Sequence, residues 1–91
     1  MDVIKRDGRL QELDVTKIKT SILNSSLDSN RIINESDLKI LTNGVVRKLN
    51  NLRGDAGTTS SYEILAIVIS TLKSEGFKEI ACAYLDYVKD W

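Results

Sequence analysis

One stretch of the chain has a helical pattern that leaves little freedom in how it folds. Between residues 38 and 52, apolar side chains recur at intervals of three and four: Leu38, Leu41, Val45, Leu49 and Leu52. This spacing predicts an α-helix with one apolar face, for which Asn34 or Ser36 is a suitable N-cap. Other parts of the chain must cover that face. With 91 residues the chain can form one core, so we expect a single domain over residues 1–91.

Three further segments show the same periodicity. They begin near Asp14, Ser60 and Lys78. Asp14 is a typical N-cap residue, and Ser60 forms an S-x-x-E capping box with Glu63. The sequence therefore predicts about four helices.

The first thirteen residues are typical of a β-hairpin. The pair Asp7-Gly8 separates two short strand-like runs, 3–5 and 10–13, and Asp-Gly is a strong signal for a tight turn. A brief third strand near residues 55–59 is an option. We therefore expect an α+β, mostly α fold, in which a short N-terminal hairpin, with or without a third small strand, caps a four-helix bundle.

Composition removes several classes of function. Thirteen lysine and arginine residues balance thirteen aspartate and glutamate residues, so the chain has no broad basic field for nucleic acid or an anionic membrane. It lacks the roughly 18–20 consecutive apolar residues of a membrane span. Its first residues also contain no hydrophobic signal segment. These features favour a cytoplasmic protein.

The chain has no histidine and one cysteine, Cys82. An intramolecular disulfide, a zinc site of the Cys/His type and histidine-based catalysis are therefore excluded. Cys82 lies between alanines in the last predicted helix, where we expect a buried structural thiol. A binding or regulatory domain fits this composition better than an enzyme.

Positive charge gathers near the N-terminus. Lys5, Arg6 and Arg9 surround the predicted turn, and Lys17 follows one helical turn into the next element. Such a cluster suits a phosphate chain, because ammonium and guanidinium groups form charge-assisted hydrogen bonds with it. The alternative is a set of solvated surface cations.

A second candidate site is the hydroxyl-rich segment 58–61 at the start of the third predicted helix. Hydroxyls and free backbone N–H groups at a helix N-terminus can bind an anion or a ribose, although ordinary capping explains the same residues. The chain contains neither a P-loop nor a Rossmann glycine pattern.

Several motifs together resemble the ATP-cone domain. The run VIKRDGR at residues 3–9, followed by Leu13-Asp14 and Lys17-Ile18, is similar to the family's opening pattern V-x-K-R-x-G…(F/L)-D-x-x-K-I. The run SYEI at residues 61–64 looks like its third helix, and the spacing of Ala81, Tyr84 and Tyr87 resembles its closing motif.

This resemblance implies a regulatory function without chemistry of its own. Members bind ATP or dATP as an allosteric effector, with or without Mg²⁺. They report to a ribonucleotide reductase, or to the bacterial repressor of reductase genes. It implies a protein partner or a covalently linked reductase or regulator domain, with oligomerisation as an option, and no direct contact with nucleic acid or membrane.

The resemblance also assigns residues. It implies Val3 beside the base, Lys5, Arg6 and Lys17 at the phosphates, and Asp14 near the base or ribose. A family threonine corresponds to Thr58, Thr59 or Ser61, and we include Thr59 and Ser61 in the predicted site. A later cation would be Lys89.

The chain departs from the family pattern at two points. Gln11 stands where members often have a glutamate, and the histidine that some members carry in the third helix is absent. These departures favour a second hypothesis, a small helical protein–protein interaction module that has lost nucleotide binding.

Overall fold

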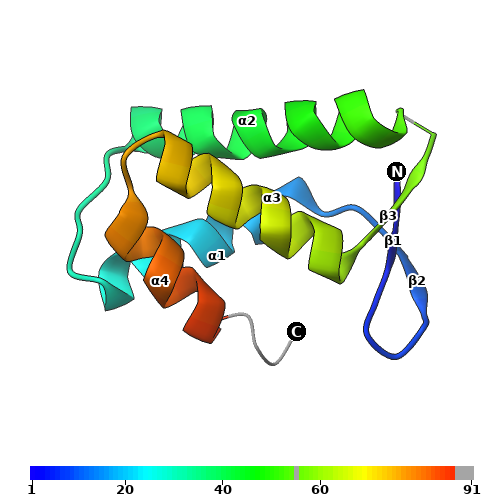
Figure 1. Ribbon diagram of the computed structural model, residues 1–91, viewed down its shortest axis with the longest axis horizontal. Helices are drawn as coiled ribbons and strands as arrows, with labels where there is room; N and C mark the ends of the chain where they lie inside the picture. Colours follow the sequence, from blue (N-terminus) through cyan, green and yellow to red (C-terminus); the bar gives the residue numbers. More distant parts are fainter. Residues whose placement is uncertain (55, 88–91) are drawn as a thin grey trace.

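A small β-sheet closes one end of a helical bundle (Figure 1). The computed structural model describes residues 1–54 and 56–87, and Lys89, the later cation that the resemblance suggests, lies outside these ranges. Within them the elements are β1 (Asp2–Ile4), β2 (Leu10–Glu12), α1 (Val15–Asp28), α2 (Glu35–Arg53), β3 (Thr58–Ser60), α3 (Ser61–Ser74) and α4 (Lys78–Tyr87). The predicted α+β, mostly α fold is confirmed, and the optional third strand is present.

The predicted hairpin is confirmed. Its loop consists of residues 6–8, beyond the hydrogen-bonded pair Lys5 and Arg9. The backbone N–H of Lys5 donates to the carbonyl of Arg9 at 2.8 Å, and that of Gly8 donates to the carbonyl of Lys5 at 2.9 Å. Gly8 has a φ of +86°, in the left-handed region that glycine adopts without steric cost. A turn followed by a left-handed residue is a common hairpin closure.

β1 is the central strand of the sheet, whose order is β2-β1-β3. It pairs antiparallel with β2, where Val3 lies opposite Gln11, and parallel with β3, where Val3 lies opposite Thr59. Parallel pairing needs a long crossover connection, which α1 and α2 supply. The sheet thus joins the beginning of the chain to the segment before α3.

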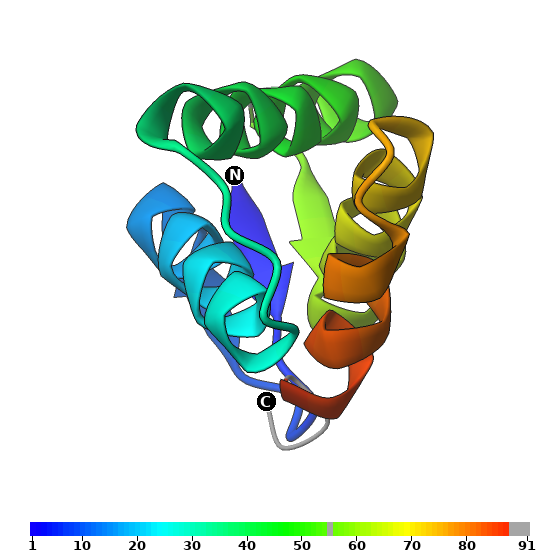
Figure 2. The same ribbon diagram turned by 90° about the vertical axis from the view of Figure 1, so that its left-hand side faces the viewer.

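Each helix packs against two others. α1 and α3 both contact α2 and α4, and Figure 2 shows α1 across from α3 and α4, with α2 spanning the top. Among the described residues, thirteen buried apolar side chains form the core: Val3, Ile18, Ile22, Leu38, Leu41, Val45, Leu49, Ile64, Val68, Leu72, Ile80, Ala81 and Tyr84. The cap of α2 is Asn34, whose side chain accepts a hydrogen bond from the backbone of Asp37 at 2.7 Å.

Some expected core positions are exposed. The prediction that Cys82 is buried was wrong, because α4 turns Ile80, Ala81 and Tyr84 inward and Cys82 falls on the other side of the helix. Leu52, the last residue of the apolar pattern in α2, is also exposed, by 63%. Among the described helices, none is both long enough and apolar enough to span a membrane.

Candidate functional site

A small hollow lies between the hairpin and the first turns of α1 and α3. Its volume is about 30 Å³, and it is lined by Val3, Lys5, Gln11, Glu12, Leu13, Asp14, Lys17, Ile18, Ser61 and Ile64. Five of the predicted site residues therefore meet here: Val3, Lys5, Asp14, Lys17 and Ser61. These residues come from three separate parts of the sequence.

The strand register explains why the hairpin residues face the same space. Side chains alternate along a strand, so Val3 and Lys5 point to one face of the sheet. Gln11 lies directly opposite Val3 in the antiparallel pair and shares that face. The position where the family often has glutamate thus lines the hollow.

Two helices begin beside the hollow and run away from the sheet (Figure 1). The side chain of Asp14 caps α1, accepting a hydrogen bond from the backbone N–H of Lys17 at 3.2 Å. The hydroxyl of Ser60 caps α3, accepting from the backbone N–H of Glu63 at 3.1 Å. Both caps confirm the predicted helix starts. Helix N-termini carry partial positive charge, so both contribute a field that favours an anion.

Two lysines add full positive charge at this place. Lys5 comes from the hairpin and Lys17 from the first turn of α1, and both line the hollow. Partial burial, followed by the repulsion of Lys17 and Arg9, lowers the pKa of Lys5 below its usual 10.5. The contribution of Lys17 to this shift, which is smaller than that of burial, reflects like charges held close together by the hairpin and α1. Bound anionic groups would relieve that repulsion.

Arg6 does not line the hollow. It lies in a neighbouring recess of about 150 Å³ formed by Lys5, Arg6, Asp7 and Arg9. Its guanidinium is 5.7 Å from the ring centroid of Tyr62, within the range of a cation–π contact. Lys5 borders both spaces, so the basic recess continues directly from the hollow.

Part of the charge in the recess is already compensated. The carboxylate of Asp7 accepts a hydrogen bond from the Nε of Arg9 at 2.6 Å and another from the Arg9 backbone N–H at 3.1 Å. These bonds lower the pKa of Asp7, the backbone one most strongly.

The two predicted hydroxyl residues have different surroundings. The side chain of Thr59 is buried, does not line the hollow, and donates a hydrogen bond to Glu63 at 2.7 Å. Ser61 is only 4% exposed and does line the hollow. Among the described residues, its hydroxyl is the buried side-chain polar atom without a hydrogen-bond partner. Such atoms are rare in folded proteins, and this one can bond to a ligand.

Sequence reasoning missed the apolar wall of the hollow. Ile18 and Ile64 are buried residues of α1 and α3, and Leu13 lies partly buried beside them. The helical spacing of Ile18 and Ile64 identified these two only as core. What distinguishes them is that each lies within one turn of its helix's start, next to the sheet.

The arrangement combines an apolar wall, an unpartnered hydroxyl and adjacent cations. This combination suits a ligand with a flat apolar ring at one end and anionic groups at the other. The volume of about 30 Å³ accommodates a water-sized group, so a ring needs movement of side chains at the rim. Among the described residues, no group of three or more histidine, cysteine, aspartate or glutamate side chains could hold a metal ion.

Comparison with known proteins gave one family. A family model described as the ATP cone domain matches residues 1–91, the whole chain. No curated protein matches the chain.

Proposed function

Because the chain belongs to the ATP-cone domain family, which makes it a nucleotide-sensing regulatory domain, we propose that its hollow binds ATP or dATP as an effector. The observation that carries this proposal is the meeting of Lys5, Lys17 and the Ser61 hydroxyl around one apolar wall. The family is regulatory and not catalytic.

We propose that the base lies against Val3, Ile18 and Ile64. The polar side chains of Asp14 and Gln11 are then close to the base or ribose. The phosphates extend past Lys5 toward Arg6, with Lys17 on the opposite side. This direction follows the charge, because Lys5 borders both the hollow and the basic recess. A Mg²⁺ ion would be held mainly by the phosphates, as is usual for nucleotide-bound magnesium.

The test is calorimetric titration with ATP and with dATP. We expect binding to the wild type, with Lys5→Ala and Lys17→Ala each weakening affinity by about tenfold or more, as loss of one charge-assisted contact predicts. Lys39→Ala is the matched control, since Lys39 is an exposed lysine of α2 outside the hollow and the recess. No binding of either nucleotide at millimolar concentration would refute the proposal and favour the interaction-module hypothesis. Binding that both site variants retain would refute the site.

We further propose that the domain reports to a ribonucleotide reductase or to a regulator of reductase genes. A regulatory domain must transmit its state, which requires different contacts in two arrangements. Sedimentation of the chain with and without a reductase catalytic subunit, in ATP and then in dATP, tests this. We expect complex formation or self-association to differ between the nucleotides. Identical sedimentation under all conditions would contradict it.

A further inference from the structure

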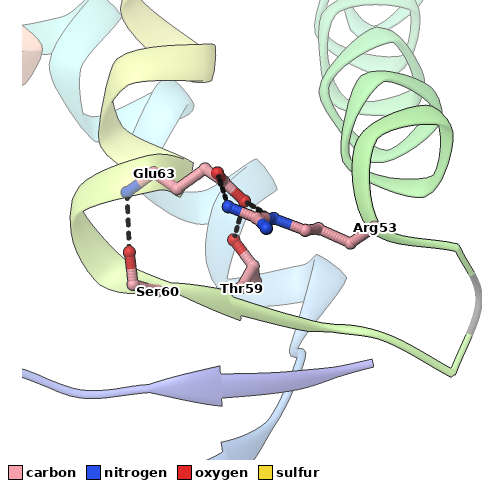
Figure 3. A network of polar contacts seen from close by, with 4 residues as sticks. All are labelled: Arg53, Thr59, Ser60 and Glu63. Atoms are coloured by element: carbon pink, nitrogen blue, oxygen red, sulfur yellow. Dashed lines mark hydrogen bonds and ion pairs between the residues drawn. The ribbon is translucent and has the colours of Figure 1, made fainter.

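Three elements meet at a polar network behind the hollow. Arg53 is the last residue of α2, Thr59 belongs to β3, and Glu63 lies in the first turn of α3. One carboxylate oxygen of Glu63 accepts from the Arg53 Nε at 2.9 Å and from the Thr59 hydroxyl at 2.7 Å. The other accepts from a terminal guanidinium nitrogen of Arg53 at 2.7 Å. Figure 3 shows Arg53 reaching from α2 toward the start of α3.

The network adjoins three of the residues that line the hollow. Ser61 lies between Thr59 and Glu63, and Ile64 directly follows Glu63; both line the hollow. Thr59 also lies opposite Val3, which forms another part of the wall. Neither Arg53 nor Glu63 lines the hollow, so, apart from the through-space effect of their charges, they can affect a ligand only through these neighbours.

Helix capping alone does not account for the network. The hydroxyl of Ser60 already accepts the backbone N–H of Glu63, which is half of the predicted capping box. The carboxylate of Glu63 bonds to Arg53 and Thr59. A bidentate arginine–carboxylate pair fixes the relative orientation of the two side chains as well as their distance. The pair therefore holds α3 in one position relative to α2 and β3.

We propose that Arg53, Glu63 and Thr59 are positioning residues that hold the first turn of α3 so that the Ser61 hydroxyl faces the bound nucleotide. This inference rests on the proposed nucleotide binding. The network thereby links the affinity of the hollow to the relative position of α2 and α3.

The substitution Glu63→Gln separates positioning from simple electrostatics. Removing a negative charge near the hollow should strengthen binding of a polyanion by Coulomb attraction. Loss of positioning should weaken it, by about three- to tenfold for one or two disrupted hydrogen bonds. We therefore expect weaker ATP binding by Glu63→Gln in calorimetry. Glu35→Gln, which removes the carboxylate of the Lys19–Glu35 pair, is the matched control and should leave affinity unchanged or slightly stronger.

Arg53→Lys provides a second variant with an unchanged net charge. Lysine keeps the positive charge but cannot form the bidentate hydrogen bonds to Glu63, so we again expect weaker ATP binding. If both Glu63→Gln and Arg53→Lys bind ATP as tightly as the wild type, the inference is wrong.

A double-mutant cycle tests whether the effect of Arg53 on ATP affinity passes through Ser61. Ser61→Ala should weaken ATP binding, and Arg53→Lys should have little additional effect in that background, because its action passes through Ser61. Fully additive losses would overturn the proposal, as would unchanged affinity in Ser61→Ala. These failures differ from failure of the proposed function, in which the wild type itself binds neither nucleotide.

Discussion

The guanidinium of Arg53 binds both carboxylate oxygens of Glu63, at 2.9 and 2.7 Å, and so joins the end of α2 to the beginning of α3. The Arg53 and Thr59 hydrogen bonds lower the pKa of Glu63 from its usual 4.5 to about 2. The carboxylate is therefore charged throughout the neutral range.

The first prediction concerns stability in acid. A carboxylate whose pKa is lower in the folded state stabilises the fold above its unfolded pKa, and this contribution is lost as pH falls through the folded pKa. For Glu63 that window runs from pH 4.5 down to about 2. We expect Glu63→Gln to reduce the free energy of unfolding by about 1 kcal/mol at pH 7, a value discounted for the half-exposed arginine partner. Urea denaturation at pH 7 and pH 2.5 should show the difference between variant and wild type shrinking on acidification. A constant difference would contradict the assignment.

The second prediction concerns the contact between α1 and α4. The Tyr84 hydroxyl lies 2.8 Å from that of Ser21, which itself donates to the carbonyl of Ile18, so Tyr84 is the donor. Both residues are buried. Tyr84→Phe should lower the free energy of unfolding by about 1 kcal/mol, the typical net worth of a buried hydrogen bond. Thermal unfolding of Tyr62→Phe is the control, and should match the wild type because Tyr62 is 63% exposed. An unchanged melting temperature in Tyr84→Phe would show that this bond contributes nothing.

The third prediction separates stability from binding. Lys17 helps to lower the pKa of Lys5, so the folded protein holds two repelling charges. Relieving that repulsion with Lys17→Met should leave the free energy of unfolding unchanged or raise it by up to about 0.5 kcal/mol at pH 7. The same variant should bind ATP more weakly. In the wild type, Lys5 loses its proton at a lower pH in the folded state than in the unfolded state. The free energy of unfolding should therefore rise with pH between the lowered pKa of Lys5 and the usual 10.5. Denaturation and calorimetry on one preparation measure both effects, and a clear loss of stability in Lys17→Met would contradict the explanation.

The fourth prediction compares two glycines. A Cβ at Gly57 would overlap the backbone carbonyl of Arg53, whereas a Cβ at Gly44 would contact Thr71 at an ordinary 3.6 Å. Gly57→Ala should therefore cost about 1–3 kcal/mol and, by displacing Arg53, also weaken ATP binding. Gly44→Ala should be neutral or stabilise the protein by up to about 1 kcal/mol, since alanine favours helix. Chemical denaturation of both variants tests this pair. Equal effects would show that Gly57 is not tightly packed against α2.

Local signals predicted much of the fold because they act within a few residues. The turn at Asp7-Gly8 and the caps at Asp14 and Ser60 each depend on one side chain and its neighbouring backbone. They were confirmed for that reason. The prediction that Cys82 is buried was wrong because three consecutive small residues, Ala81, Cys82 and Ala83, do not show which side of a short helix faces the core.

The site depends on contacts between residues far apart in the chain. Sequence motifs named Lys5, Lys17 and Ser61, but their meeting follows from the packing of α1 and α3 against the hairpin. Only the structure shows that Ser61 lines the hollow and Thr59 does not. The reason is that β3 pairs with β1 in a register that buries Thr59 against Glu63.

The sequence by itself determined the helix-forming segments, the tight turn, the caps and the local surplus of positive charge. These follow from side-chain chemistry and spacing along the chain. Only the tertiary structure decided that β3 runs parallel to β1, that Arg6 lies outside the hollow, and that Arg53 holds Glu63. The physical reason is that non-local pairing is selected by the packing of the whole core, which no short segment encodes.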